Sequence, residues 1–127
     1  MSAFSPRQMF LLDLACKPIW DTYGGEVYLV GTANARGAYR DVDIRLILPD
    51  KKYDRLRKAI GLDGIALMGL TTGQYIASLT GMPIDFQVQR RTEANEKHAH
   101  AEHRRNPIGL RTMLSFRGDA TPPEDGR

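Results

Sequence analysis

The chain has 127 residues, 42% of them hydrophobic, and 18 Lys and Arg against 15 Asp and Glu give a formal net charge of +3. This length suits one domain, and no apolar run approaches the roughly 20 residues of a membrane-spanning helix, so we expect no membrane partner. The lone cysteine, Cys16, cannot form an internal disulfide and the first residues lack a signal-peptide pattern, which together predict a cytoplasmic location.

The first predicted element is a helix. Ser5 is placed as its N-cap, Pro6 as its first residue, and Gln8 as the partner that completes a capping box. Pro18 is expected to kink or stop this helix, because a proline disfavours helical geometry at the residue before it. A Tyr-Gly-Gly turn then leads to residues 26–30, whose β-branched and aromatic side chains predict a strand.

Residues 41–48 alternate polar and apolar side chains before becoming wholly apolar, which predicts a second strand. The polar face of this strand carries Asp41, Asp43 and Arg45. Since residues two apart in a strand point to the same side, the two acids share that face.

Two helices are predicted next. The spacing of apolar residues favours a helix over residues 50–60, which Gly61 stops. Thr71 or Thr72 can cap another helix, and Gly81 sits where a C-terminal glycine belongs.

Residues 84–89 alternate polar and apolar side chains and predict a third strand. Its polar face carries Asp85, Gln87 and Gln89. A polar helix is predicted over residues 92–105, before an Asn-Pro pair.

These elements indicate an α+β fold, with a small mixed sheet and helices packed on one of its faces. We expect a single domain over residues 1–117, in which residues 108–116 pack back on the rest. Residues 118–127 carry two prolines, two glycines and four charges, and are predicted to be a disordered tail.

Three carboxylates on two predicted strands form the most informative pattern. Asp41 and Asp43 project about 7 Å apart from one side of a strand, and Asp85 joins them if its strand lies alongside. Three ionised carboxylates repel one another unless a hard divalent cation such as Mg²⁺ neutralises them. The pattern therefore predicts a metal site at these acids.

A glycine-rich turn, residues 31–37, lies between the first predicted strand and the acids. Its backbone N–H groups and Arg36 could receive phosphate oxygens. Acids that can bind a metal, next to backbone amides that can bind phosphate, predict a combined nucleotide and metal site.

A resemblance to a known family rests on three motifs, Gly31-Thr32-Ala33-Asn34-Ala35-Arg36-Gly37, Asp41-Val42-Asp43 and Ile84-Asp85-Phe86. Together they resemble the nucleotidyltransferase superfamily that includes DNA polymerase beta, and the minimal nucleotidyltransferases of bacteria and phages most of all. The turn in those proteins commonly reads Gly-Ser-x-Ala-Arg-Gly. Here Thr32 replaces the serine and keeps a hydroxyl, and Arg45 stands where the family more often has an acidic or apolar residue.

The resemblance implies a nucleotidyltransferase fold and transfer of a nucleoside monophosphate from an NTP, with ATP expected, to a hydroxyl of a protein or RNA. It implies two Mg²⁺ ions, for which Mn²⁺ could substitute, bound by Asp41, Asp43 and Asp85. Asp85 would favour deprotonation of the acceptor, and a homodimer or partner subunit would help to select that acceptor. The β- and γ-phosphates would be held by Gly31 and Thr32, with help from Arg36.

Two other functions fit the sequence. A chain that keeps this fold without catalysis would be a nucleotide-binding or protein-interaction module. The second of these functions is RNA binding by a small basic domain in which the three acids have no functional role. A zinc site at His98, His100 and His103 is disfavoured, because the charged, alanine-rich flanks suit a solvated helix.

Overall fold

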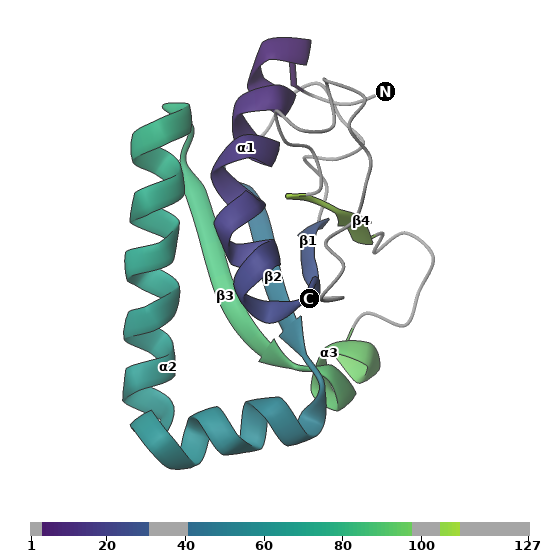
Figure 1. The fold of residues 1–127 in the computed structure, drawn as a ribbon, viewed down its shortest axis with the longest axis vertical. Helices are drawn as coiled ribbons and strands as arrows, with labels where there is room; N and C mark the ends of the chain where they lie inside the picture. The colour runs from purple at the N-terminus through teal and green to yellow at the C-terminus, as the bar shows by residue number, and fades with distance from the viewer. Residues whose placement is uncertain (1–3, 31–40, 98–104, 110–127) are drawn as a thin grey trace, which may run out of the picture.

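The computed structural model describes residues 4–30, 41–97 and 105–109, which form three helices and a four-stranded sheet (Figure 1). In chain order the elements are α1 (Pro6–Tyr23), β1 (Val27–Val30), β2 (Val42–Leu48), α2 (Asp50–Thr80), β3 (Ile84–Arg90), α3 (Arg91–Lys97) and β4 (Arg105–Pro107). Within these ranges, no helix is long and apolar enough to cross a membrane.

The sheet is mixed, with the strand order β3-β2-β1-β4. β2 pairs in parallel with β3, whereas β1 pairs antiparallel with both β2 and β4. A parallel pair needs a long crossover, and α2 provides it by carrying the chain from the end of β2 to the start of β3 (Figure 1). The predicted α+β class with a small mixed sheet is confirmed.

One face of the sheet is apolar, because alternate residues of each strand point to the same side. This face packs with α1 and α2 to form the core. Strand residues in the core include Val27, Leu29, Ile44, Leu46 and Phe86.

On β2 and β3, the opposite face of the sheet carries polar side chains except at one end. Ile47 alternates with Asp43 and Arg45 along β2, yet it is only 2% exposed. The short helix α3 contacts β2 and β3 and covers this end. The prediction that helices pack on one face is therefore correct for α1 and α2 but wrong for α3.

α1 begins as the sequence predicts. The Ser5 hydroxyl accepts a hydrogen bond from the Gln8 N–H at 3.1 Å, and the Gln8 side chain accepts one from the Ser5 N–H at 2.9 Å. Pro18 does not stop the helix, which continues to Tyr23. Burial of Ile19 on the core side stabilises the helix beyond the proline, so tertiary packing outweighs the local preference.

α2 consists of two helical halves that meet at Gly61, so the predicted end of the first helix at this glycine is confirmed, while the second half begins before the predicted cap at Thr71 or Thr72. Gly61 has a φ of 76° and a ψ of 171°, outside the helical region, and the helix turns there (Figure 1). Residues 62–70 are also helical. Beyond the bend, a Cβ on Gly69 would lie 3.0 Å from the main-chain oxygen of Phe86, so the missing side chain lets α2 approach the edge of β3.

The predicted helix over residues 92–105 is wrong at its end. α3 ends at Lys97, and Arg105 lies in β4, where it pairs with Val30 of β1. Residues 98–104, between these two elements, lie outside the described residues.

The last described residues return to α1. Ile108 is buried in the core, and the Gly109 N–H donates a hydrogen bond to the buried carboxylate of Asp13. The prediction that residues 108–116 pack back on the rest of the domain is therefore confirmed for Ile108 and Gly109. The predicted tail at 118–127 lies outside the described residues.

Candidate active site

Asp43 and Asp85 lie side by side in the sheet. They are register partners in the parallel pair of β2 and β3, so their side chains leave the same face at the strand spacing of about 4.8 Å. Each acid is followed by a buried apolar residue, Ile44 or Phe86, and a shift of register would turn these residues out of the core. The strand adjacency that the acid pattern required is confirmed.

Asp41 comes directly before β2, is exposed, and is two residues from Asp43. Burial raises the pKa of the Asp43 carboxyl above its ordinary value. The negative charges of Asp85 and Asp41 raise this pKa further, while Arg45 acts in the opposite direction. The three carboxylates therefore interact electrostatically across the start of two strands.

Arg45 places a positive charge beside these acids. Its Nη1 donates to the main-chain oxygens of Ile44 at 3.0 Å and Asp85 at 2.7 Å, and its Nη2 lies 3.3 Å from the Asp85 Oδ2. Gln87, the register partner of Arg45, donates to the same carboxylate at 3.3 and 3.4 Å. The Asp85 carboxylate is thus held by a neighbour on each strand.

The donor set of Asp41, Asp43 and Asp85 suits a hard divalent cation, because all three side chains offer carboxylate oxygens. Burial is the main cause of the raised pKa of Asp43 and repulsion from Asp85 and Asp41 adds to it, and a cation would relieve this repulsion. Among the residues that the structure describes, however, no three such side chains converge as a metal-binding group. The Asp85 carboxylate faces Arg45 and Gln87, so metal binding requires it to exchange these partners for the cation.

The other residues predicted for a site lie outside the described residues. These are Gly31, Thr32 and Arg36 of the glycine-rich turn and the histidines His98, His100 and His103. β1 ends at Val30, which is the register partner of Asp43. The segment that contains the predicted phosphate-binding turn therefore starts beside the acids.

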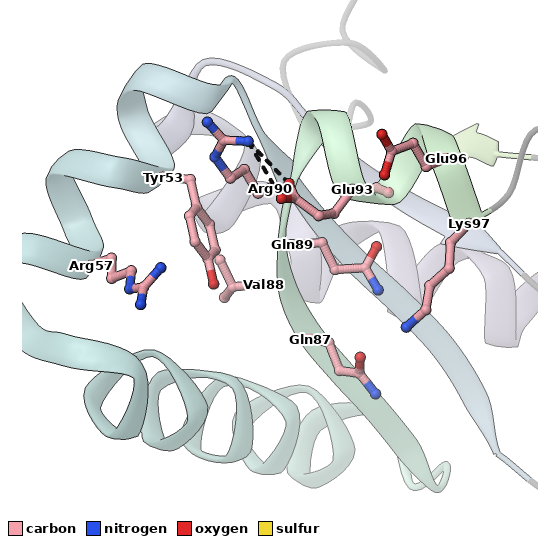
Figure 2. Close-up of a pocket in the computed structure, with 10 residues that line it drawn as sticks. Tyr53, Arg57, Gln87, Val88, Gln89, Arg90, Glu93, Glu96 and Lys97 are labelled. Carbon is pink, nitrogen blue, oxygen red and sulfur yellow. Dashed lines mark hydrogen bonds and ion pairs between the residues drawn. The ribbon is translucent and has the colours of Figure 1, made fainter.

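A pocket of about 600 Å³ lies farther along β3, at the edge of the sheet (Figure 2). The first part of α2 and the short helix α3 form its sides. We call it the strand-edge pocket. It is lined by Tyr53, Arg57, Gln87, Val88, Gln89, Arg90, Glu93, Ala94, Glu96 and Lys97.

The strand-edge pocket continues the polar face that carries the acids. Gln87 and Gln89 follow Asp85 at alternate positions of β3, and in Figure 2 their amides point to the same side of the strand as the Lys97 amino group. The Gln89 Oε1 is buried and has no hydrogen-bond partner within the described part of the chain. Arg90, in contrast, is engaged with carboxylates of α2 and α3. The amides of Gln87 and Gln89 and the Lys97 amino group are therefore the polar groups that β3 and the end of α3 contribute to the pocket lining.

The sequence placed Gln87 and Gln89 on a polar strand face but did not predict this pocket. Tyr53 and Arg57 come from α2, whereas Lys97 comes from α3, which follows β3. Only tertiary packing brings these residues together, so no spacing in the sequence could predict the pocket.

No family model matches this sequence, and no curated protein or solved structure does either. The functional assignment therefore rests on the geometry of the acids and on the resemblance of the three motifs.

Proposed function

We propose that this protein is a Mg²⁺-dependent nucleotidyltransferase that moves a nucleoside monophosphate from an NTP, with ATP expected, to an acceptor hydroxyl and releases pyrophosphate. The observation that carries the proposal is the register that sets Asp43 beside Asp85, with Asp41 two residues away. An Asp-x-Asp strand joined by an acid from a following strand is what the resemblance implies. The nucleotidyltransferase fold is part of the same proposal.

In this proposal Asp41, Asp43 and Asp85 would hold two Mg²⁺ ions. Such ions would supply stabilisation of the charge on the attacking and leaving oxygens of an in-line displacement. The acceptor oxygen forms a bond to the α-phosphorus while the bond from that phosphorus to pyrophosphate breaks. Asp85 favours loss of the hydroxyl proton, which leaves to water. Phosphate binding falls to Gly31, Thr32 and Arg36.

The strand-edge pocket is the place that we propose for the acceptor, a protein or an RNA. Asp85 and Gln89 are four positions apart along an extended strand, a distance of about 13 Å. An acceptor group bound at Gln89 and Lys97 can therefore extend along β3 and present a hydroxyl near Asp85. The pocket lies on the β3 side of β2, whereas the predicted phosphate turn follows β1 on the other side.

One observation favours a second candidate, a non-catalytic nucleotide-binding or interaction module with the same fold. Arg45 already neutralises part of the acidic charge by pairing with Asp85, as a structural ion pair would. In such a module the guanidinium replaces the cation and turnover is absent.

Label transfer tests the proposal directly. The full chain is incubated with Mg²⁺, α-³²P-labelled NTPs and either total protein or total RNA, and transferred label is counted. We expect Asp43→Asn to abolish transfer, because it removes a charge that both metal ions need. Asp63→Asn is the matched control, since Asp63 is an exposed acid of α2 that does not belong to the cluster. Nucleotide binding without label transfer from any NTP would favour the second candidate.

A further inference from the structure

We propose that the second half of α2, residues 64–80, is the interface through which two copies of this chain form a homodimer. In Figure 1 this half of α2 stands at the left margin of the fold, with β3 on its inner side. Gly69 and Gly73 are buried against β3, so the side chains on the outer side of the helix lie under no described element. The inference does not depend on the chemistry proposed for the acids.

The exposed side chains of this half carry no charge. Eight of residues 64–80 are exposed, and we call them the uncharged face: Ala66, Leu67, Leu70, Thr71, Gln74, Tyr75, Ser78 and Leu79. The first part of the same helix differs, because six of the eight exposed residues between 50 and 60 are charged. A helix that faces only water normally carries charges on its outer side, as that first part does. The change within one helix therefore marks the uncharged face as a surface that another protein covers.

Half of the uncharged face is large and apolar. Leu67, Leu70, Tyr75 and Leu79 are between 39% and 73% exposed. Leu67 and Leu70 are three residues apart, which places them on the same side of the helix. The 17 residues of this half span about 25 Å. A patch of about 800 Å², which each partner buries in an interface of standard size, is about as wide.

The absence of charge also identifies the occupant. A nucleic acid or a strongly charged protein finds no opposite charge on this face to pair with. A helix that lies on a membrane carries lysine or arginine on its polar side, and residues 64–80 include neither. A second copy presents the same uncharged, apolar surface, so two chains of net charge +3 meet here without repulsion. A twofold axis is the commonest way in which identical faces meet.

A twofold axis across the helix sets the two copies antiparallel, so that the ends of opposite helix dipole lie together. A largely apolar pocket of about 430 Å³ opens beside the uncharged face, between α2 and β3, and Ile65, Leu70 and Phe86 are among the residues that line it. Each copy therefore has both exposed leucines and a recess that can receive a large side chain, as a self-complementary contact needs. Asp85 also lines this pocket, so the second copy lies beside the acidic strand.

The first experiment measures the mass of the full chain by sedimentation velocity, at concentrations from about 1 to about 200 µM. We expect a dimer that dissociates on dilution. The double variant L67E,L70E brings like charges together and should raise the Kd of the dimer at least about 100-fold, with the circular dichroism of the wild type. L14E is the matched control, because Leu14 is an exposed leucine of α1 outside the uncharged face, and it should remain a dimer.

The second experiment needs no charged variant to fold. T71C places a thiol near the middle of the uncharged face, and Cys16, the only cysteine of the native chain, is buried. Residues near a twofold axis lie close to their own counterparts, so mild oxidation should convert most of T71C to a disulfide-linked dimer. K58C, at an exposed position of the first part of α2, should cross-link at least about tenfold more slowly.

A wild type that stays monomeric up to about 200 µM overturns the inference, and so does a dimer that L67E,L70E leaves intact. In a monomer, slow reaction of T71C with a thiol reagent would show that the chain itself covers this face. Co-sedimentation of a monomer with phosphatidylcholine vesicles would show that a lipid surface covers it. Both results contradict a second copy. None of these outcomes bears on label transfer, and a failure of label transfer leaves the dimer untouched.

Discussion

Asp43 of β2 is the register partner of Asp85 in β3, and burial together with this neighbouring charge holds the pKa of Asp43 above its ordinary value of 3.8. A carboxyl whose pKa is raised by folding is less stable as an anion in the folded state than in the unfolded chain. At neutral pH, ionised Asp43 therefore destabilises the fold. Such a cost is expected of a group retained for function.

Asp43→Asn should accordingly stabilise the protein at pH 7, raising Tm by about 2–4 °C, a shift that corresponds to less than about 1 kcal/mol for a chain of this size. The gain should shrink as the pH falls through the raised pKa of Asp43, and disappear below about pH 3.8, where both states are protonated. Calorimetry of both proteins from pH 3 to 8 measures this. Asp63→Asn, the same change on an exposed helical surface, is the control, and a loss of stability in Asp43→Asn at pH 7 would mean that folding does not raise the pKa of Asp43.

Alternation along β2 and β3 was enough to predict both strands and the face that carries the acids. The strands can be predicted because polar and apolar residues alternate along both of them, so the local sequence specifies which face is polar. The pairing of Arg45 with Asp85 was not predictable. It depends on the relative register of two strands that are 40 residues apart in the sequence.

The path of α2 beyond Gly61 could not be predicted from the local sequence. Residues 62–70 have no clear amphipathic pattern, since Leu62 is 54% exposed and Leu70 is 73% exposed while Gly69 is buried. Gly61 correctly predicted an interruption, but packing of the second half of the helix on β3 turns that interruption into a bend.

Gly69 is the tightest point of this packing. In Gly69→Ala the new Cβ would be 3.0 Å from the Phe86 main-chain oxygen, and neither backbone can shift without disturbing β3. We expect a loss of about 1–3 kcal/mol in the free energy of unfolding, as for other overpacked sites, despite the better helix propensity of alanine. Urea unfolding followed by circular dichroism measures the change.

Gln74→Ala provides the comparison for Gly69→Ala, because Gln74 is an exposed position of the same helix. It should change stability by less than about 0.5 kcal/mol. Equal stability of Gly69→Ala and the wild type would show that α2 and β3 are not packed as closely as described.

Cys16 should be chemically inert in the folded protein. It is buried on α1, and burial followed by the nearby charge of Asp13 raises the pKa of its thiol to about 12. Because the thiolate is the reactive form, alkylation at pH 8 should be at least about 100-fold slower in the native protein than in urea. Mass spectrometry of iodoacetamide-treated samples measures both rates. Native labelling as fast as that of the unfolded chain would be inconsistent with this placement.

A separate prediction concerns the acceptor, which we propose to bind in the strand-edge pocket. The Lys97 amino group lies on the side of β3 to which Gln87 and Gln89 point, so Lys97→Glu should weaken binding of an acceptor that carries negative charge. Once label transfer has identified an acceptor, the variant should raise its KM about tenfold and leave the KM for the NTP within about twofold. Lys58→Glu makes the same charge change on an exposed part of α2 that does not line this pocket, and should behave as the wild type. Equal effects of the two variants would mean that net charge, and not the pocket, controls acceptor binding. A rise in the KM for the NTP alone would place the nucleotide in the pocket, and the acceptor would then have to approach the acids from another side.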